Sequence, residues 1–553
     1  MNGLVMLLIA AVVLSFGYFG YGRFLEKKWG IDPNKKTPAF ELEDGVDYVP
    51  TKPSVVFGHE FASVAGAGPI NGPIQAAMFG WLPVLLWILI GGVFIGSVQD
   101  FASLYASVKN KGKTIGYLIE LYIGKTGKRL FLLFTWLFSI LVVAAFADIV
   151  AGTFMGFAPT DGAKIQANAS VATTSILFIA AAIVLGFFIR RAKPSGIVSG
   201  AVAVVFLVLS ITVGLLCPIY VEKGVWMYLV FIYIFIASIT PVWALLQPRD
   251  YLNSFLLVAM IAAAFIGVVF AHPAINLPAF TGFKVGTSYM FPILFVTVAC
   301  GAVSGFHSLV ASGTASKQIE NERHMLPIGF GSMCVESLLA VLALVAVGSL
   351  AGADGAMPKG TPPQIFANAV AGFLVNLGLP QNVIFTLITL SVSAFALTSL
   401  DSVARVGRLS WQELFTEEGN TSPLFKLFSN KYFATVITLI FGYLLGIVGY
   451  AKIWPLFGSA NQLLAALALI ACAVFLKKTK RQGAMLWVPM IVMLAVTFSA
   501  LALIMKQKIG LLSAGTMKFS SDGLQLIFAV LLLALGVLVA ISGVSKLGSK
   551  EKA

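Results

Sequence analysis

Acidic residues inside apolar segments are the groups of this sequence best suited to do chemistry. Asp100, Asp148, Glu336 and Asp401 each interrupt an apolar stretch, as in "VVAAFADIVAG" around Asp148. An isolated carboxyl group in a low-dielectric site holds a proton readily and can carry one. A carboxyl group satisfied by a neighbouring hydroxyl or backbone group is the alternative at each position. We treat all four as candidates for ion coupling or gating.

Asp401 has a cationic neighbour on the same helical face. In "ALTSLDSVARVGR", Arg405 follows Asp401 by four residues, which places the two side chains one turn apart. This spacing predicts an ion pair, with either a structural role or a role as a gate that opens on ligand binding. Thr398 and Ser399, about one turn earlier, would line the same cavity and are further candidate substrate-binding residues.

Two further stretches combine apolar character with residues that interrupt helices. The first, "FASVAGAGPINGPIQAAMFG" (61–80), contains two prolines and several glycines, and "VACGAVSG" (298–305) resembles it. Both patterns predict a helix that is broken mid-span, near 66–69 and 301–305. The candidate binding residues in these stretches are Gly66, Ala67, Gly68, Pro69 and Asn71 in the first, and Gly301, Ser304, His307 and Ser308 in the second.

A broken helix has a physical cost that calls for an explanation. Backbone N–H and C=O groups in lipid must be bonded, so an unwound turn is tolerated only inside protein or beside a polar cavity. The N-terminal end of a half-helix attracts an anion, and glycine allows a ligand close to the backbone. The alternative is a glycine- and proline-induced kink that serves tight helix packing. His307 would titrate near neutral pH, bond a ligand carboxylate or make a structural hydrogen bond.

Composition places these residues in a membrane. Of the 553 residues, 59% are hydrophobic and 11% are charged, whereas a soluble domain has about 25% charged residues. Apolar runs of helix-spanning length recur along the whole chain, which indicates an all-α polytopic membrane protein. The net charge of +14 lies in short loops, so it predicts topology and not nucleic-acid binding. The four Cys and four His are scattered, so no metal site or other cofactor is expected.

Hydropathy predicts fifteen membrane spans. The apolar segment Met1 to Tyr21 lacks the features of a cleaved signal peptide, so we expect it to stay in the protein and to form the first span. With the N-terminus outside and the C-terminus in the cytoplasm, the inside segments hold 29 of the 37 Lys and Arg residues, as the positive-inside rule requires. The expected spans are 3–22, 57–80, 84–108, 130–157, 171–189, 196–219, 225–245, 251–272, 289–315, 326–351, 382–404, 432–450, 454–476, 484–505 and 522–543.

The spans fall into two blocks that would run in opposite directions through the membrane. A helix and cytoplasmic loop (1–56) precede the first block (57–272), and the second block covers 289–543. Each block has seven spans and opens with a broken helix. Inverted repeats of this kind are typical of secondary transporters, whose binding sites lie where the helices break.

Five motifs in order also resemble one known family. They are "DGVDYVPT", "FGHEFASVAGAGPINGP", "SGFHSLVASGTASKQIENE", "LTSLDSVARVGRLSWQEL" and "WPLFGSANQLLAALAL". The chain resembles the carbon starvation protein A family of the amino acid–polyamine–organocation superfamily. The resemblance implies a bacterial or archaeal inner-membrane protein, linked to carbon starvation, that takes up peptides or pyruvate with protons. It also implies five-plus-five inverted repeats; our count fits these or a seven-plus-seven arrangement.

These observations predict a secondary active importer of a small carboxylate or peptide. Four buried acids and His307 favour a proton over sodium as the coupling ion, although Ser304, Ser308 and Thr398 could supply oxygens to sodium. The alternatives are a sodium-coupled amino-acid symporter, a channel and a membrane sensor. No nucleotide-binding motif or catalytic triad is recognisable, so an enzyme is not expected. The oligomeric state stays open, as does the choice of substrate.

Overall fold

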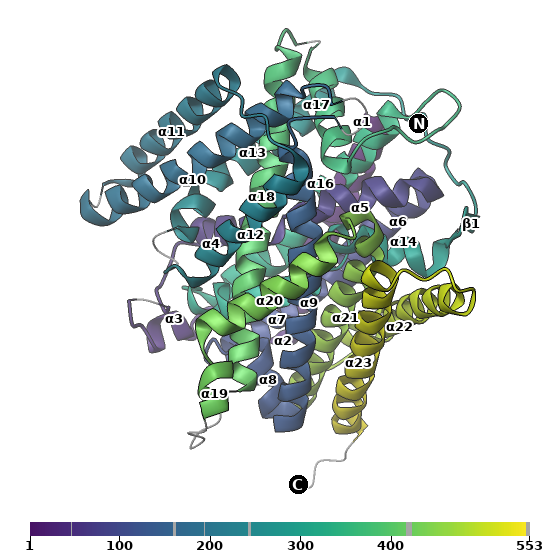
Figure 1. Cartoon of the computed structure of the whole chain (residues 1–553). Coiled ribbons are helices and arrows are strands. Elements are labelled where there is room, and N and C mark those ends of the chain that lie inside the picture. The colour runs from purple at the N-terminus through teal and green to yellow at the C-terminus, as the bar shows by residue number, and fades with distance from the viewer. Residues whose placement is uncertain are drawn as a thin grey trace.

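The computed structural model describes residues 1–45, 47–158, 162–192, 194–241, 245–375, 377–415 and 423–548. Helices dominate this part of the chain, and a short antiparallel hairpin of β1 (Lys284–Val285) and β2 (Ser288–Tyr289) precedes α14. Figure 1 shows a bundle of long helices. The sequence prediction of an all-α polytopic protein is therefore confirmed.

The first half of the chain contains thirteen α-helices in its described part. Short π-helical turns join α1 to α2 (Gly17–Gly22) and α6 to α7 (Gly92–Gly96). The α-helices are α1 (Gly3–Phe16), α2 (Arg23–Trp29), α3 (Pro38–Glu41), α4 (Pro53–Val64), α5 (Gly68–Ala76), α6 (Trp81–Gly91), α7 (Ser97–Lys109), α8 (Ile115–Tyr122), α9 (Lys125–Phe154), α10 (Gln166–Ala192), α11 (Gly196–Leu216), α12 (Lys223–Ile239) and α13 (Leu246–Ala271).

The second half follows the hairpin. A 3-10 turn (Ala299–Gly301) ends α14, and a π-helical turn (Leu326–Gly331) leads into α16. The α-helices are α14 (Met290–Val298), α15 (Gly305–Gly313), α16 (Ser332–Leu350), α17 (Pro362–Val375), α18 (Gln381–Leu414), α19 (Pro423–Phe428), α20 (Lys431–Gly446), α21 (Tyr450–Lys478), α22 (Ala484–Ser513) and α23 (Leu524–Gly548).

Twelve helices in the described part of the chain are long and apolar enough to cross a membrane. Three expected spans are missing from these twelve: 57–80 is broken, while α12 and α20 are shorter apolar helices. The count of fifteen spans thus stays a prediction, and the end of the expected span 225–245 lies partly outside the described residues. The helix α17, which lies between the expected spans 326–351 and 382–404, is largely buried against α13, α16 and α18.

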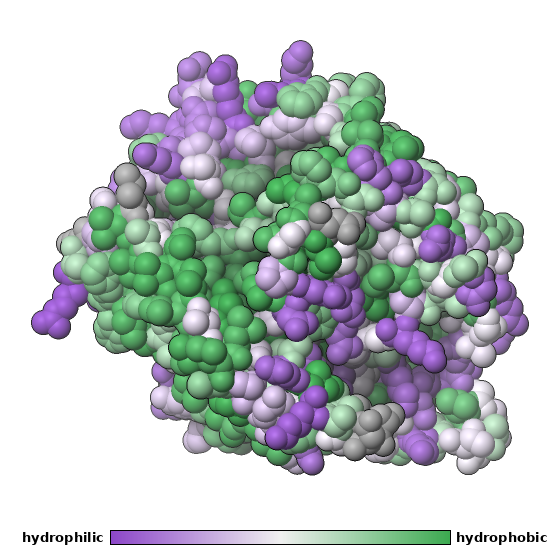
Figure 2. Space-filling view, turned by 90° about the horizontal axis from the view of Figure 1, so that it is seen from above, coloured by the Kyte–Doolittle hydropathy of each residue, from purple (hydrophilic) through white to green (hydrophobic). Residues whose placement is uncertain are grey.

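The surface and the core divide as a lipid-embedded bundle requires. Seen from above, hydrophobic residues cover much of the rim (Figure 2), and α11 alone exposes Val205, Val208 and Leu216. In contrast, α21 is buried along most of its length, and α9 and α18 pack against each other. Water would penalise such an exposed apolar surface, whereas lipid tails do not.

The ends of the described chain lie at opposite ends of the bundle. Figure 1 shows the start of α1 at the top and the end of α23 at the bottom. This arrangement agrees with termini on opposite sides of a membrane. The orientation, with the N-terminus outside, stays a prediction.

Both predicted helix interruptions are present. The first separates α4 from α5 at residues 65–67, and the second separates α14 from α15 between the 3-10 turn and Gly305. Close packing accompanies the breaks. A Cβ atom built on Gly72 of α5 would lie 2.3 Å from the carbonyl oxygen of Val298 and 2.7 Å from that of Thr297. The helix break that the sequence predicted and the tight helix packing that it offered as the alternative occur together.

This contact predicts that Gly72→Ala destabilises the protein by about 1–3 kcal/mol, because overpacking against backbone cannot be relieved by a side-chain movement. The matched control is Gly152→Ala on α9, where a Cβ would meet nothing within 4 Å; it is expected to be neutral or to stabilise by up to about 1 kcal/mol through helix propensity. The measurement is the thermal unfolding midpoint in detergent. Equal midpoints for the two variants would contradict the packing described.

Candidate functional site

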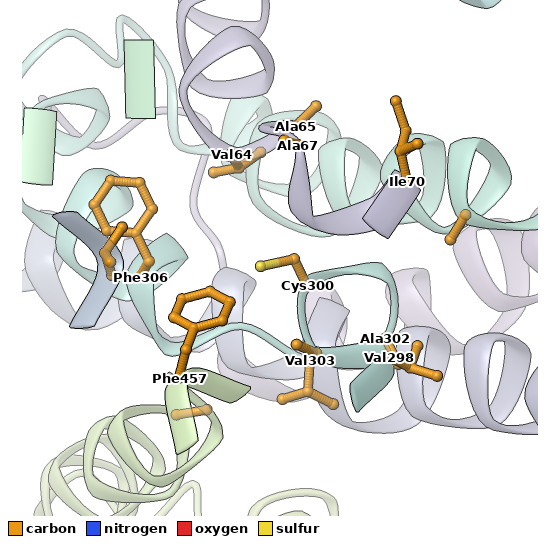
Figure 3. Close-up of a cluster of buried hydrophobic side chains, with 14 of the residues drawn as sticks. Val64, Ala65, Ala67, Ile70, Val298, Cys300, Ala302, Val303, Phe306 and Phe457 are labelled. Atoms are coloured by element: carbon orange, nitrogen blue, oxygen red, sulfur yellow. The ribbon is translucent and has the colours of Figure 1, made fainter. Parts of the chain in front are cut away.

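A small cavity lies between the two interrupted helices. Figure 3 shows Val64, Cys300, Phe306 and Phe457 around it, from α4, the 3-10 turn, α15 and α21. Its free volume is about 20 Å³, room for about one water molecule. The conformation is therefore closed around this point. The full lining is Val64, Gly66, Gly68, Phe138, Val142, Phe146, Cys300, Phe306, Ser399, Val403, Phe457 and Asn461.

Three of the predicted binding residues line this cavity: Gly66, Gly68 and Ser399. A Cβ atom on Gly66 would lie 2.5 Å from the hydroxyl oxygen of Ser399, so α18 packs directly on the first break. Thr398 does not face the cavity. It accepts a hydrogen bond of 2.5 Å from Asn253 and donates one of 2.9 Å to the Ala394 carbonyl, because successive residues of α18 point in different directions.

The remaining predicted residues of the first stretch lie close by. Ala67 ends the break, and Pro69 lies in the first turn of α5, where its missing N–H costs nothing. A Cβ on Gly301 would lie 3.7 Å from the Cα of Pro69, so the two breaks touch. Asn71 is fully buried, and neither of its side-chain polar atoms has a partner.

Asn461 of α21 holds the second break in place. Its Oδ1 accepts a hydrogen bond from the Phe306 backbone N–H at 3.2 Å, and its Nδ2 donates to Ser304 Oγ at 3.1 Å and to Cys300 Sγ at 3.3 Å. One amide thus bonds three groups in and beside the unwound turn while it also lines the cavity. Sequence analysis did not include it among the binding candidates.

The carbonyl groups near the end of α14 are bonded to side chains. Phe295 O accepts from Trp87 Nε1 at 3.2 Å and from Gln462 Nε2 at 2.7 Å, and Thr297 O accepts from Trp454 Nε1 at 3.0 Å. These contacts satisfy oxygens in the last turns of this half-helix. They also occupy oxygens that could otherwise coordinate a sodium ion.

Hydroxyl and amide groups connect α15 to α7. Gln99 Nε2 donates to the Ser304 carbonyl at 2.9 Å and to Ser308 Oγ at 2.5 Å, and Ser103 Oγ donates to Ser308 Oγ at 3.0 Å. Ser308 therefore faces α7 and not the cavity. In this conformation Ser308 connects α15 to α7, and its role in ligand binding stays a prediction.

His307, the next residue after the cavity-lining Phe306, lies between two of the predicted acids. Its Nδ1 is 2.8 Å from Asp100 Oδ2 of α7, and its Nε2 is 3.3 Å from Glu336 Oε2 of α16. All three side chains are at most 2% exposed. The sequence suggested that Asp100 and Glu336 are isolated, but both carboxyl groups contact His307. His307 thus contacts carboxyl groups of the protein itself.

Glu60 of α4 belongs to the same cluster. It is 1% exposed, its Oε2 has no hydrogen-bond partner, and it lies within electrostatic range of Asp100 and His307. Sequence analysis did not count Glu60 as an intramembrane acid because it lies near the predicted end of its span. Its position one turn before the "AGAGP" break was the available signal. We call Glu60, Asp100, His307 and Glu336 the histidine–carboxylate cluster.

The amino-acid sequence matches the model of one protein family. The family model described as "Carbon starvation protein CstA" matches residues 2–357 and 349–500. The chain belongs to the CstA family. The resemblance inferred from the five motifs is thereby confirmed, and four of those motifs contribute residues to the cavity and the cluster, among them Glu60, His307, Ser399 and Asn461.

Two curated relatives indicate what CstA-family proteins do. "Peptide transporter CstA" of Escherichia coli K12 is 32% identical, over 87% of this chain and 78% of the relative. "Pyruvate/proton symporter BtsT" of the same organism is 32% identical, over 86% of this chain and 78% of the relative. Among solved structures, a mutant manganese transporter of Eremococcus coleocola aligns over 89% of this chain and 95% of that one, with a TM-score of 0.47 and 12% identity.

Elsewhere in this CstA-family chain, Asp401 has a different partner from the one predicted. Its Oδ2 is paired with the Arg249 guanidinium of α13 and accepts a hydrogen bond of 2.7 Å from the Tyr233 hydroxyl of α12. Arg405 instead donates to the Ala237 and Thr240 carbonyls, at 2.8 and 2.6 Å. The expected pair within α18 is wrong because the C-terminal end of α12 offers Arg405 free carbonyls.

Asp148 is also paired, and it lies apart from the histidine–carboxylate cluster. Its Oδ1 is 2.7 Å from Lys223 Nζ, and its Oδ2 accepts a hydrogen bond of 3.0 Å from the Tyr450 backbone N–H. Asp148 lies near the end of α9, and its two partners are the first residues of α12 and α21. The sequence interpretation of Asp148 as an isolated acid is therefore wrong.

Gln462 and His59 lie near the site but do not line the cavity. Gln462 bonds the Phe295 carbonyl across helices, as a structural amide would. His59 on α4 is half-buried and lies within electrostatic range of Asp250, which is itself 3.3 Å from Arg249. His59 thus belongs to the Arg249–Asp401 region and not to the cavity.

Proposed function

We propose that this protein is a proton-coupled importer of a small carboxylate or peptide in the bacterial inner membrane, with its N-terminus outside and its C-terminus in the cytoplasm. One observation carries the proposal: both interrupted helices meet at a single cavity, and a buried histidine–carboxylate cluster directly adjoins it. Broken helices that meet in a bundle are typical of substrate sites in secondary transporters. The family relatives are named as peptide and pyruvate/proton transporters.

The chemistry of the cavity suits a small anion with an apolar body. Phe138, Phe146 and Phe457 supply apolar walls, and Ser399 and Asn461 supply neutral polar groups. The N-terminal ends of α5 and α15 start at the breaks and favour a negative charge through their aligned peptide dipoles. A carboxylate placed between the breaks would therefore be stabilised without a cationic side chain.

Two observations favour a proton over sodium as the coupling ion. The carbonyl groups of Phe295 and Thr297, in the last turns of α14, are already bonded to side chains, and a sodium site in such folds uses freed carbonyl oxygens. Titratable groups, by comparison, are abundant beside the cavity.

The test is uptake by purified protein in liposomes with an imposed pH gradient, acid outside, with and without sodium. The substrates are labelled pyruvate, a dipeptide and a neutral amino acid. We expect saturable accumulation of pyruvate or the dipeptide that disappears with a proton uncoupler and persists without sodium. Accumulation that requires sodium and ignores the pH gradient would refute proton coupling. Flux that never exceeds equilibrium would indicate a channel.

A further inference from the structure

Two helices connect the cavity directly to the histidine–carboxylate cluster. On α15, Phe306 lines the cavity and the next residue, His307, lies between Asp100 and Glu336. On α4, Val64 lines the cavity and Glu60 lies four residues earlier, one turn along the same helical face. Each interrupted helix therefore carries residues of the cavity and one member of the cluster.

The charge of the cluster requires bound protons. Three carboxylates against one imidazolium would leave excess negative charge in a buried place, which is far more costly than burying neutral carboxyl groups. In the described part of the chain, no lysine or arginine pairs with Glu60, Asp100 or Glu336. Glu60 Oε2, Asp100 Oδ1 and Glu336 Oε1 are buried and accept no hydrogen bond, and Glu336 Oε2 has His307 Nε2 at 3.3 Å as its one close charged neighbour among the described residues.

The other groups packed around the cluster do not supply the missing charge. Cys300 lies within electrostatic range of Glu336, and it is the titratable group that the 3-10 turn brings there. On α21 the neighbour of α15 is the neutral Asn461. On α13, which packs against α4, Arg249 is committed to Asp401 and Asp250. Protons are thus the available way to neutralise the cluster.

We propose that the transported proton binds in the histidine–carboxylate cluster, and that Glu60 is the member that couples proton binding to the substrate cavity. This inference rests on the proposed function. Glu60 is on α4, the half-helix before the first break, while Asp100 and Glu336 are on α7 and α16. A proton on the cluster removes repulsion between these helices and allows α4 to close beside the cavity. Its loss drives α4 away and opens the site.

The test compares two modes of transport in liposomes. Net uptake against a gradient requires the proton to be carried and released, whereas exchange of internal for external substrate does not. A gradient of about two pH units can accumulate a one-proton symport substrate about a hundredfold, since each unit is a factor of ten. We expect Glu60→Gln, which mimics a permanently protonated group, to lower accumulation to about onefold and to keep exchange within about twofold of wild type.

The matched control is Asp148→Asn, which neutralises a buried acid outside the cluster and leaves the partly exposed Lys223 behind. We expect it to accumulate substrate as the wild type does. Glu60→Asp, which keeps a titratable group, is expected to restore part of the pH-driven accumulation. If wild type couples to the pH gradient and Glu60→Gln accumulates substrate normally, the inference is overturned while the proposed function stands.

If Glu60→Gln loses both net uptake and exchange, a second variant tests the inference. If Glu60→Gln fails to insert or fold, Glu336→Gln replaces it, since it neutralises another member of the cluster from α16 and carries the same expectation. Retained exchange with lost accumulation in Glu336→Gln would support the cluster as the proton site. Full accumulation in Glu336→Gln would overturn it. A wild-type protein that ignores the pH gradient would refute the proposed function itself.

Discussion

Replacing Asp401 with asparagine is expected to destabilise the protein by about 3–5 kcal/mol, because it strands a buried charge. Its partner Arg249 is 1% exposed and pairs with Asp401 through a guanidinium that also donates to the Tyr233 hydroxyl at 2.6 Å. The pair joins α13 to α18, and Tyr233 adds α12. Removing the carboxylate leaves the guanidinium with the more distant Asp250, at 3.3 Å, as its remaining acidic partner.

A double substitution separates the observed pair from the predicted one. Arg249→Gln combined with Asp401→Asn removes both charges, so it should recover a large part of the stability that Asp401→Asn loses. Arg405→Gln combined with Asp401→Asn should recover none, since Arg405 bonds the Ala237 and Thr240 carbonyls. The measurement is the thermal unfolding midpoint of the three variants in detergent. Recovery by Arg405→Gln instead of Arg249→Gln would contradict the contacts described.

The second large effect concerns Asn461→Ala. This change leaves the Phe306 N–H, Ser304 Oγ and Cys300 Sγ without their shared partner. A buried polar group that loses its partner costs about 1–3 kcal/mol, which corresponds to a loss of about five- to 140-fold in an equilibrium constant. We expect the apparent affinity for substrate to fall by that factor, because the unwound turn that shapes the cavity is no longer held.

The matched control for Asn461 is Ser459→Ala on the same helix. Ser459 donates only to the Pro455 carbonyl of its own helix, at 2.6 Å, and such a bond within one helix contributes little to stability. Uptake should therefore keep its wild-type KM in Ser459→Ala. The measurement is initial uptake rate against substrate concentration for both variants. A normal KM in Asn461→Ala would show that the amide is not needed to shape the site.

The interrupted helices illustrate what local sequence can predict. Glycine and proline act on the backbone at their own positions, so "AGAGP" and "ACGAVSG" mark the breaks without knowledge of any neighbour. The same holds for the spans, because hydropathy over about twenty residues reflects transfer into lipid and not a specific contact. The close contact between Gly72 and the Val298 carbonyl, however, depends on how α5 packs against α14, which the local sequence does not specify.

Charged residues show the opposite behaviour. Asp401 lies four residues from Arg405 in the sequence, yet its partner Arg249 is 152 residues away, and Asp148 pairs with Lys223 from another helix. A helix brings residues i and i+4 within reach, but a buried charge pairs with the group that packing delivers to it. Hydropathy therefore identified Asp100, Glu336 and Asp401 as buried acids but missed Glu60, and sequence spacing could not identify the partners of these acids.

The sequence by itself determined that the chain is a polytopic helical membrane protein of the CstA family with two broken helices, because these properties depend on hydropathy, on glycine and proline, and on motifs read in order. Only the tertiary structure decided that Glu60, Asp100, His307 and Glu336 form one cluster beside the cavity. These residues come from four separate helices. The energy of a buried titratable group depends on the charges and dipoles around it in space, and helix packing alone sets that arrangement.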